Sequence, residues 1–344
     1  MSKTNRIYHD GNFSSTNAFM EYKKMKETEI KDLLTSLFNK VDEMKRLKKT
    51  EAYLKNRKII DKYHILYTAL IYAVINGRKD IVDFLIEKGD VDNWKEVLIF
   101  AVETGRKDIV DALLGKADID NWDEEWEDVL VAAIRTNQID IFKYLFERFE
   151  ESLFGYLYFE EAGKSGHQNI IDYLLEKDPD CSEYILDGAA KGGHKDIVKR
   201  LLENGNYDLN NVLEYAAIGG HKDVIDFLIK KGADDLNTAL SSAALSRNVE
   251  TLKYLIEQGA DDLNGALTSA AMFGNVEALK FLIEQGADDL NKALSYAVMD
   301  DHDHVIEVLI RMGATDLEAA LVEAVESGRI NATDCLLKHI FEVK

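Results

Sequence analysis

The sequence predicts an all-α solenoid of about ten helix-turn-helix repeats with a helical N-terminal cap. Residues 232–258 and 259–285 are near copies of each other, with 20 of 27 positions identical. Each copy also contains two short stretches in which apolar residues recur every three or four positions, as they do along one face of an α-helix. A fixed period of this kind is typical of small units that bury their apolar faces only by stacking on one another.

Within one repeat, the first helix is predicted over residues 236–246 and the second over 249–258. The apolar positions of the first helix follow the i, i+3, i+4, i+7, i+8 pattern and are Leu236, Ala239, Leu240, Ala243 and Ala244. Its small alanines allow neighbouring backbones to approach, whereas the second helix carries larger side chains that fill the space between repeats. Gly259 is placed to close the second helix in a left-handed conformation. Asp235, or Asn237 a little later, is placed to cap the following first helix.

The short turn between the two helices marks each repeat along the chain. These turns fall at Gly77, Gly105, Asn137, Gly166, Gly193, Gly220, Arg247, Gly274, Asp301 and Gly328. The spacing is irregular at first and is 27 residues from Gly166 onward. We therefore assign residues 64–344 to the repeat array.

The first 63 residues do not follow the repeat. Residues 1–16 are expected to be disordered. Residues 17–63 contain apolar residues at helical spacing from Phe19 to Leu47, followed by a basic stretch at 45–62. Because a solenoid needs its end covered, we interpret residues 17–63 as a helical N-terminal cap. The alternative is a docking element for a partner protein or an acidic surface.

The repeat resembles that of the ankyrin repeat family. The nearest single stretch is Ala-Ala-Lys-Gly-Gly-His-Lys-Asp-Ile-Val at residues 189–198, and the likeness extends over residues 64–340. Two features differ from the family pattern. Asn-Thr-Ala-Leu (237–240) stands where the family begins with Thr-Pro-Leu-His, and the period is shorter than the family's, which is about 33 residues. The missing residues would build the family's projecting β-hairpin finger, so a tight turn such as 232–235 is expected there. Short acidic units of this kind look similar to ankyrin-like arrays of large DNA viruses, and intracellular bacteria encode comparable ones.

The charge of the chain is strongly acidic and unevenly distributed. The net charge is −21, and residues 64–344 alone carry 54 acidic against 27 basic side chains. Such a surface is expected to repel nucleic acid and anionic lipid and to attract a partner with a basic surface. Solubility of a long exposed array is the other explanation of the charge.

Composition also indicates a compartment. No apolar run is long enough to span a membrane, and the N-terminus lacks the apolar stretch of a secretion signal. Cys181 and Cys335 fall in different repeats, as expected for free thiols. We therefore expect a cytoplasmic or nuclear protein that binds no membrane.

No motif predicts catalysis, a cofactor or a metal. His167, His194 and His221 recur 27 residues apart, but packed helices lie about 8–10 Å apart, which is too far for one shared metal ion. The ankyrin resemblance implies that these histidines brace the turn between the helices. The cluster at residues 300–304, Asp-Asp-His-Asp-His, is interpreted as a degenerate repeat turn in preference to a metal site. The protein is therefore expected not to be an enzyme and to need no cofactor.

The predicted partner site lies on the variable positions of the first helices, which face the concave surface of an ankyrin fold. These positions carry apolar and aromatic residues where a solvent-facing surface would normally carry Lys, Glu or Ser. They are Tyr215, Ile218, Leu245, Met272, Phe273, Tyr296, Met299, Tyr72 and Phe100. The alternative is that some of them pack as core against the neighbouring helix. Trp126, in an acidic segment, is a weaker candidate for contact with a basic partner.

These observations predict a non-catalytic protein-recognition module that binds its partner on the concave face. The resemblance adds the hypothesis of a viral or bacterial factor that engages or inhibits a host protein. Two alternatives remain open. One is an acidic nucleic-acid mimic that occupies the basic cleft of a DNA- or RNA-handling protein. The other is a self-assembling scaffold in which basic residues 45–62 meet the acidic array of another copy.

Overall fold

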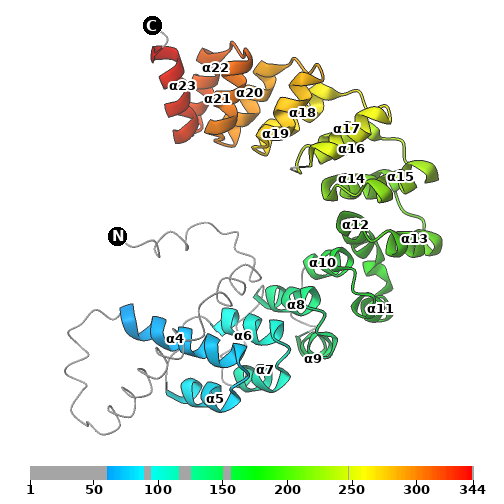
Figure 1. The fold of residues 1–344 in the computed structure, drawn as a ribbon, viewed down its shortest axis with the longest axis vertical. Coiled ribbons are helices and arrows are strands. Elements are labelled where there is room, and N and C mark those ends of the chain that lie inside the picture. The colour runs from blue at the N-terminus through cyan, green and yellow to red at the C-terminus, as the bar shows by residue number, and fades with distance from the viewer. Residues whose placement is uncertain (1–59, 89–93, 116–124, 150–155, 247, 343–344) are drawn as a thin grey trace. The chain divides into compact units, whose positions relative to one another are not determined.

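Figure 1 shows the computed structural model of the protein, which describes residues 60–88, 94–115, 125–149, 156–246 and 248–342. The segment predicted to be disordered and nearly all of the predicted cap lie outside the described residues. The chain divides into two compact units, residues 1–158 and 159–344, and each is described by itself.

In the first unit, helices pair in the predicted helix-turn-helix order. They are α4 (Ile60–Ile75), α5 (Lys79–Lys88), α6 (Trp94–Glu103), α7 (Lys107–Leu114), α8 (Glu125–Arg135) and α9 (Ile139–Phe149). The first helices of successive repeats, α4, α6 and α8, pack on one another, and α5 packs on α7. The interior they enclose is apolar, with residues such as Leu70, Val97 and Phe142 fully buried.

The second unit continues the same arrangement with greater regularity. Helix α10 (Leu157–Ser165) includes the boundary between the units, which falls after residue 158. A short 3-10 helix at Pro179–Cys181 precedes α12. The other first helices are α12 (Ser182–Gly192), α14 (Leu209–Gly219), α16 (Leu236–Ala243), α18 (Leu263–Met272), α20 (Leu290–Met299) and α22 (Leu317–Glu326). The second helices are α11 (Gln168–Lys177), α13 (Lys195–Asn204), α15 (Lys222–Lys231), α17 (Val249–Glu257), α19 (Val276–Glu284), α21 (Asp303–Met312) and α23 (Ile330–Glu342).

The predicted all-α repeat fold is confirmed. The described residues form helices and turns and contain no strand. From α12 to α22 each first helix packs on the next. Among the second helices, α13 packs on α15, and α17, α19, α21 and α23 pack in succession. The alanines expected to permit close approach, for example Ala239 and Ala243, are completely buried in these contacts. No helix in the described part of the chain is both long and apolar enough to cross a bilayer.

Left-handed residues end the helices where the sequence predicts them. Gly259 has φ +112° after α17, and the turns between paired helices hold a glycine of positive φ in most repeats. Asn137 and Asp301 adopt the same conformation at the equivalent turn positions, with φ of 56° and 59°. Both residue types tolerate this region better than most others do, because their short polar side chains bond locally.

A side-chain hook fastens each loop of the regular repeats to the repeat before it. The Asn264 Oδ1 atom accepts hydrogen bonds from the backbone N–H groups of Asp288 (2.9 Å) and Asp289 (3.1 Å), and its Nδ2 donates to Asp288 Oδ1 (3.0 Å). The same arrangement recurs at the asparagines 27 residues apart, namely Asn210, Asn237, Asn264 and Asn291. One amide therefore organises the tight turn that stands where the family's finger would be.

This hook decides between the two residues predicted to cap α16. Asp235 caps α16 by accepting the backbone N–H of Thr238 at 3.0 Å, as one alternative proposed. Asn237 does not cap that helix but binds the next loop, at Asp261 and Asp262. Sequence position alone did not separate these two roles, because both residues stand beside the same helix start.

Candidate protein-binding surface

The first helices of the second unit present equivalent residues at 27-residue intervals. Because these helices stack directly, residues at one repeat position form a row across the unit. The row at the C-terminal ends of the first helices, here called the end row, consists of Lys191, Ile218, Leu245, Met272, Met299 and Glu326. Four consecutive members are apolar, between a lysine and a glutamate.

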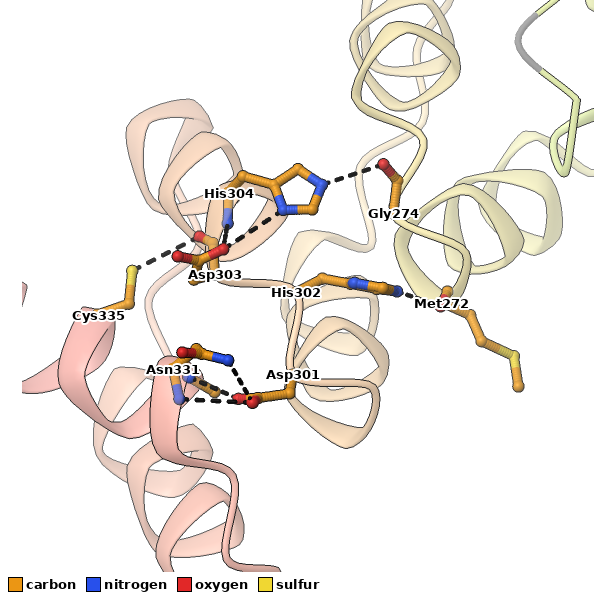
Figure 2. A network of polar contacts seen from close by, with 9 residues as sticks. Met272, Gly274, Asp301, His302, Asp303, His304, Asn331 and Cys335 are labelled. Atoms are coloured by element: carbon orange, nitrogen blue, oxygen red, sulfur yellow. Dashed lines mark hydrogen bonds and ion pairs between the residues drawn. The ribbon is translucent and has the colours of Figure 1, made fainter. Parts of the chain in front are cut away.

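Part of this row is exposed. Met272 is 39% and Met299 47% accessible to solvent, and the neighbouring Phe273 is 57% accessible. These three side chains, here called the apolar patch, come from α18, its C-terminal turn and α20. Figure 2 shows the Met272 side chain extending away from the turn that contains His302. A patch of exposed Met and Phe is the composition expected at the centre of a protein interface.

The other predicted residues of the second unit are half-buried. They are Tyr215, Ile218, Leu245 and Tyr296. Tyr72 of α4, in the first unit, is also half-buried. Each of these side chains packs partly on its neighbours and keeps some accessible surface, which is compatible with a contact role and with a packing role.

The structure corrects two predictions about aromatic residues. Phe100 is completely buried inside α6 and its neighbours, so it belongs to the core and is removed from the candidate surface. Trp126 is also buried, with its ring stacked on that of Phe149 at 3.6 Å between centroids. Trp126 is therefore a structural anchor and does not present an exposed ring.

The paired aspartates of the loops have mainly structural contacts. In each pair the first, such as Asp288, receives the hook of the preceding repeat, and the second, such as Asp289, caps the next helix by accepting the N–H of Lys292. The pairs at 234–235, 261–262 and 288–289 are nevertheless exposed. They therefore place a row of negative charge along one edge of the second unit.

A polar cluster on the first-helix face was not predicted. Its centre is Asp187 of α12, which is only 7% accessible and whose two carboxylate oxygens both accept from Asn211 Nδ2 at 3.2 Å. Burial, and the negative charges of Glu183, Glu160 and Glu214, raise the pKa of Asp187 to about 7, against the lowering effect of the Asn211 hydrogen bond. The available signal was a carboxylate in the midst of an otherwise apolar stretch, Ile-Leu-Asp-Gly-Ala-Ala at 185–190.

A lysine on the same helix as Asp187 is already paired. Lys191 Nζ lies 2.8 Å from Glu160 Oε1 and 6.0 Å from the centroid of the Tyr215 ring. Glu214, the equivalent of Asp187 in the next repeat, accepts a long hydrogen bond from Ser242 Oγ at 3.4 Å. Its partial burial raises its pKa as well. The cluster thus combines several carboxyl groups with tyrosines on the same face as the apolar patch.

Two of the turn histidines bond across repeats. His194 donates from Nε2 to the backbone carbonyl of Lys164 at 2.9 Å, 30 residues earlier. His302 donates in the same way to Met272 at 3.0 Å. The bracing role implied by the family resemblance is therefore present at His194, and His302 has the same contact. Each of these two histidines connects its turn to the end of the preceding first helix.

The cluster at 300–304 is likewise tied into the fold, as Figure 2 shows. The Asp301 carboxylate accepts from the Ala332 N–H and from Asn331 Nδ2, both at 2.7 Å, and so caps α23. His304 donates from Nε2 to the Gly274 carbonyl at 3.2 Å. Within the described residues, no three His, Cys, Asp or Glu side chains are arranged to hold a metal ion. Cys181 and Cys335 are free thiols.

One family model matches most of the length of the chain. A family model described as ankyrin repeats (three copies) matches overlapping windows of the chain at residues 33–125, 70–153, 98–185, 159–237, 186–266, 234–292 and 267–344. The first window begins inside the segment predicted to be a cap. No curated protein matches. A solved structure that is similar is the human ASB11 ankyrin repeat domain, with 21% identity, a TM-score of 0.36, and coverage of 44% of this chain and 82% of that one.

Proposed function

Since this chain belongs to the ankyrin repeat family, whose arrays are generally protein–protein interaction modules, we propose that it is a non-catalytic recognition protein that binds a partner protein on the first-helix face of its second unit. The observation that carries this proposal is the apolar patch. Met272, Phe273 and Met299 are exposed on a fold whose other first-helix residues of similar size are mostly covered.

The acidic charge gives the partner a second property. The net charge of −21 and the exposed aspartate pairs favour a partner with a basic surface. Charge complementarity guides association and selects among partners, whereas burial of apolar side chains supplies most of the affinity. A viral or bacterial factor that engages a host protein in the cytoplasm or nucleus would fit this description, as would any other intracellular adaptor.

The test is partner capture with the full-length chain and two matched triple variants. In the first variant Met272, Phe273 and Met299 become Ser. In the control, three other exposed apolar residues of the second unit, Val322, Val325 and Ile330, become Ser. We expect the first variant to lose the captured protein and the control to retain it, because only the first removes the apolar patch.

Two salt concentrations separate the proposed function from its alternatives. A partner held by the apolar patch should survive about 0.5 M salt, at which the Debye length is only a few ångströms. Basic nucleic-acid-binding proteins that are lost at high salt, whichever triple variant is used, would support the nucleic-acid mimic instead. Self-assembly would appear as particles of the purified protein that are heavier than one chain and whose mass depends on the salt concentration.

A further inference from the structure

The second helices of the second unit form a small pocket that the proposed function does not use. It has a volume of about 200 Å³ and is lined from one side by Gly220 and Lys222, at the start of α15. From the other side it is lined by α17 and the residue before it, with Asn248, Thr251 and Tyr254 among the lining side chains. The apolar patch lies on first helices and their turns, so this pocket is a separate feature of the surface.

Thr251 directs an unpaired hydroxyl group toward this pocket. The residue is only 3% accessible to solvent, yet its Oγ1 atom has no hydrogen-bond partner among the described residues. Oγ1 lies 3.2 Å from the position that a Cβ atom would take at Gly220, so the hydroxyl faces the side of the turn that the glycine leaves open. A buried polar group is costly to leave unpaired. A group that enters the pocket and accepts this hydrogen bond therefore gains free energy.

The start of α17 lacks the side-chain partner that the next repeat provides. Asn248 makes no capping hydrogen bond to α17, whereas the equivalent Asn275 caps α19 by accepting the N–H of Ala278 at 3.2 Å. At the same repeat position, His194, Asn275 and His302 each bond to a backbone carbonyl 30 or 31 residues earlier. The Asn248 side chain makes no such bond within the described part of the chain. The N–H groups at an uncapped helix start carry partial positive charge and attract anions.

The charge around the pocket is more positive than that of the chain as a whole. Lys222 has its ammonium group 4.2 Å from the centroid of the Tyr254 ring and forms no ion pair within the described residues. Three further ammonium groups lie between 5.7 and 5.9 Å from the centroid of the Phe227 ring of α15. They belong to Lys195, Lys199 and Lys231. Helices α13 and α15 together carry six basic and four acidic side chains, whereas acidic residues outnumber basic ones twofold in the whole array, 54 to 27.

We propose that this pocket receives a carboxylate side chain from an acidic segment of a partner protein, held by the Thr251 hydroxyl, the start of α17 and the Lys222 ammonium group. The lysines around Phe227 extend the contact to further acidic residues of the same segment. Glu250 and Glu257 also line the pocket, and their charge disfavours a doubly charged phosphate group or a nucleic acid. The chain then has two interfaces, this one on second helices and the apolar patch on first helices.

The experiment measures binding of the full-length chain to a short fluorescent peptide that alternates glutamate with serine. In the control peptide glutamine replaces glutamate. We expect fluorescence anisotropy to show that the glutamate peptide binds about tenfold more tightly or better, because its carboxylates form charge-assisted hydrogen bonds. Inorganic phosphate is then added at constant ionic strength. Displacement of the peptide by phosphate would assign the pocket to phosphate groups and overturn the proposal, whereas retention of the peptide supports it.

Thr251→Val tests the unpaired hydroxyl at nearly constant side-chain volume. We expect this variant to bind the glutamate peptide about tenfold more weakly, because one hydrogen bond to a charged group is lost. Its midpoint of urea unfolding should stay the same or rise, since the hydroxyl has no partner in the free protein. A purely structural role predicts the reverse, a loss of stability with unchanged binding. Thr268→Val, which removes a hydroxyl bonded to the Asn264 carbonyl at 2.9 Å, is the control and should bind as the wild type does.

Two further variants assign the binding to the pocket. Lys222→Gln should weaken it, whereas Lys280→Gln, the same charge change on α19, should not. Asn248→His introduces the residue that other repeats have at this position. Its ring should cover Gly220 as the His221 ring covers Gly193, and so fill the pocket and abolish binding in a folded protein.

Three results would overturn the inference. They are equal binding of the glutamate and glutamine peptides, wild-type binding by Thr251→Val, and equal weakening by Lys222→Gln and Lys280→Gln. The triple variant of the apolar patch should bind the glutamate peptide as the wild type does, because the two surfaces share no residue. This inference and the proposed function can therefore fail separately.

Discussion

At the scale of single residues, Asp187 is the group whose environment has the clearest consequence for stability. Its pKa is about 7 in the folded chain, against 3.8 for an unperturbed aspartate. Between these values the folded state keeps a proton that the unfolded state has released, so the free energy of unfolding falls as the pH rises from about 4 to about 7. Above pH 7 the carboxyl group is ionised in both states, so its effect on the free energy of unfolding no longer changes with pH.

We therefore expect Asp187→Asn to stabilise the second unit at pH 8, by at most about 4 kcal/mol, and to have little effect near pH 4. Urea denaturation at a series of pH values measures the difference between the variant and the wild type. Asp196→Asn is the control, because Asp196 is exposed on α13. A constant difference between Asp187→Asn and wild type across this range would show that the carboxyl group does not titrate near neutrality.

Residue-level features divide into those that the sequence could predict and those that it could not. Gly259 and Asp235 were correctly predicted, since each role depends on the residue's own backbone or on a neighbour three positions away. Phe100 was wrongly placed on the surface because its burial depends on how α6 packs against other helices. Asp187 was missed for a similar reason: its carboxyl group is desolvated by α10 and α14, which lie in other repeats.

At the scale of elements, the approach of α10 and α12 depends on two glycines. A Cβ atom at Gly188 would lie 2.0 Å from the Glu160 carbonyl oxygen, and one at Gly163 would lie 2.0 Å from that of Ile185. Both contacts are with backbone atoms, which cannot swing away as a side chain can. The helices would have to separate to admit even a methyl group.

Gly188→Ala is expected to destabilise the second unit by about 3 kcal/mol, in the range found when a packed core is overfilled. Gly265→Ala in α18 is the matched control, because a Cβ atom there meets mainly the Asp262 side chain. The gain in helix propensity should offset most of that clash, so its effect should remain within about 1 kcal/mol. Thermal or urea unfolding measures the loss of stability in each variant. An equal loss in Gly188→Ala and Gly265→Ala would contradict the close contact between α10 and α12.

The asparagine hooks determine how the shortened loops are held. Asn264→Ala removes three hydrogen bonds and leaves the N–H groups of Asp288 and Asp289 without their acceptor. We expect a loss of about 2–3 kcal/mol and faster amide hydrogen exchange at those two residues. Asn204→Ala, which removes one bond to Arg200 in an exposed part of α13, should cost less than about 1 kcal/mol. Unchanged exchange at Asp288 and Asp289 would contradict the hook.

Helix positions were predictable because they follow from local periodicity. The second helix expected at 249–258 is α17, Val249–Glu257, and the first, expected at 236–246, ends earlier, at Ala243. The loops were harder to predict. The absence of a finger followed from the short period, but the use of Asn237 to bind the next loop requires a contact 24 residues away, which no local pattern indicates.

At the scale of the whole molecule, charge and apolar surface have separable effects on binding. The net charge of −21 acts over a Debye length and mainly raises the rate at which a basic partner arrives. The apolar patch acts only after contact, so it mainly determines how long the complex lasts.

We therefore expect that, for the partner identified by capture, raising the salt concentration from about 0.05 M to about 0.5 M slows association by about tenfold or more and changes dissociation little. Replacing Met272, Phe273 and Met299 by Ser should have the opposite pattern, with faster dissociation and nearly unchanged association. Surface-based kinetics on the full-length chain measure both rates, with the Val322, Val325 and Ile330 variant as control. If salt instead accelerated dissociation and the patch variant matched the wild type, the affinity would come from charge, and the protein would act as an acidic mimic.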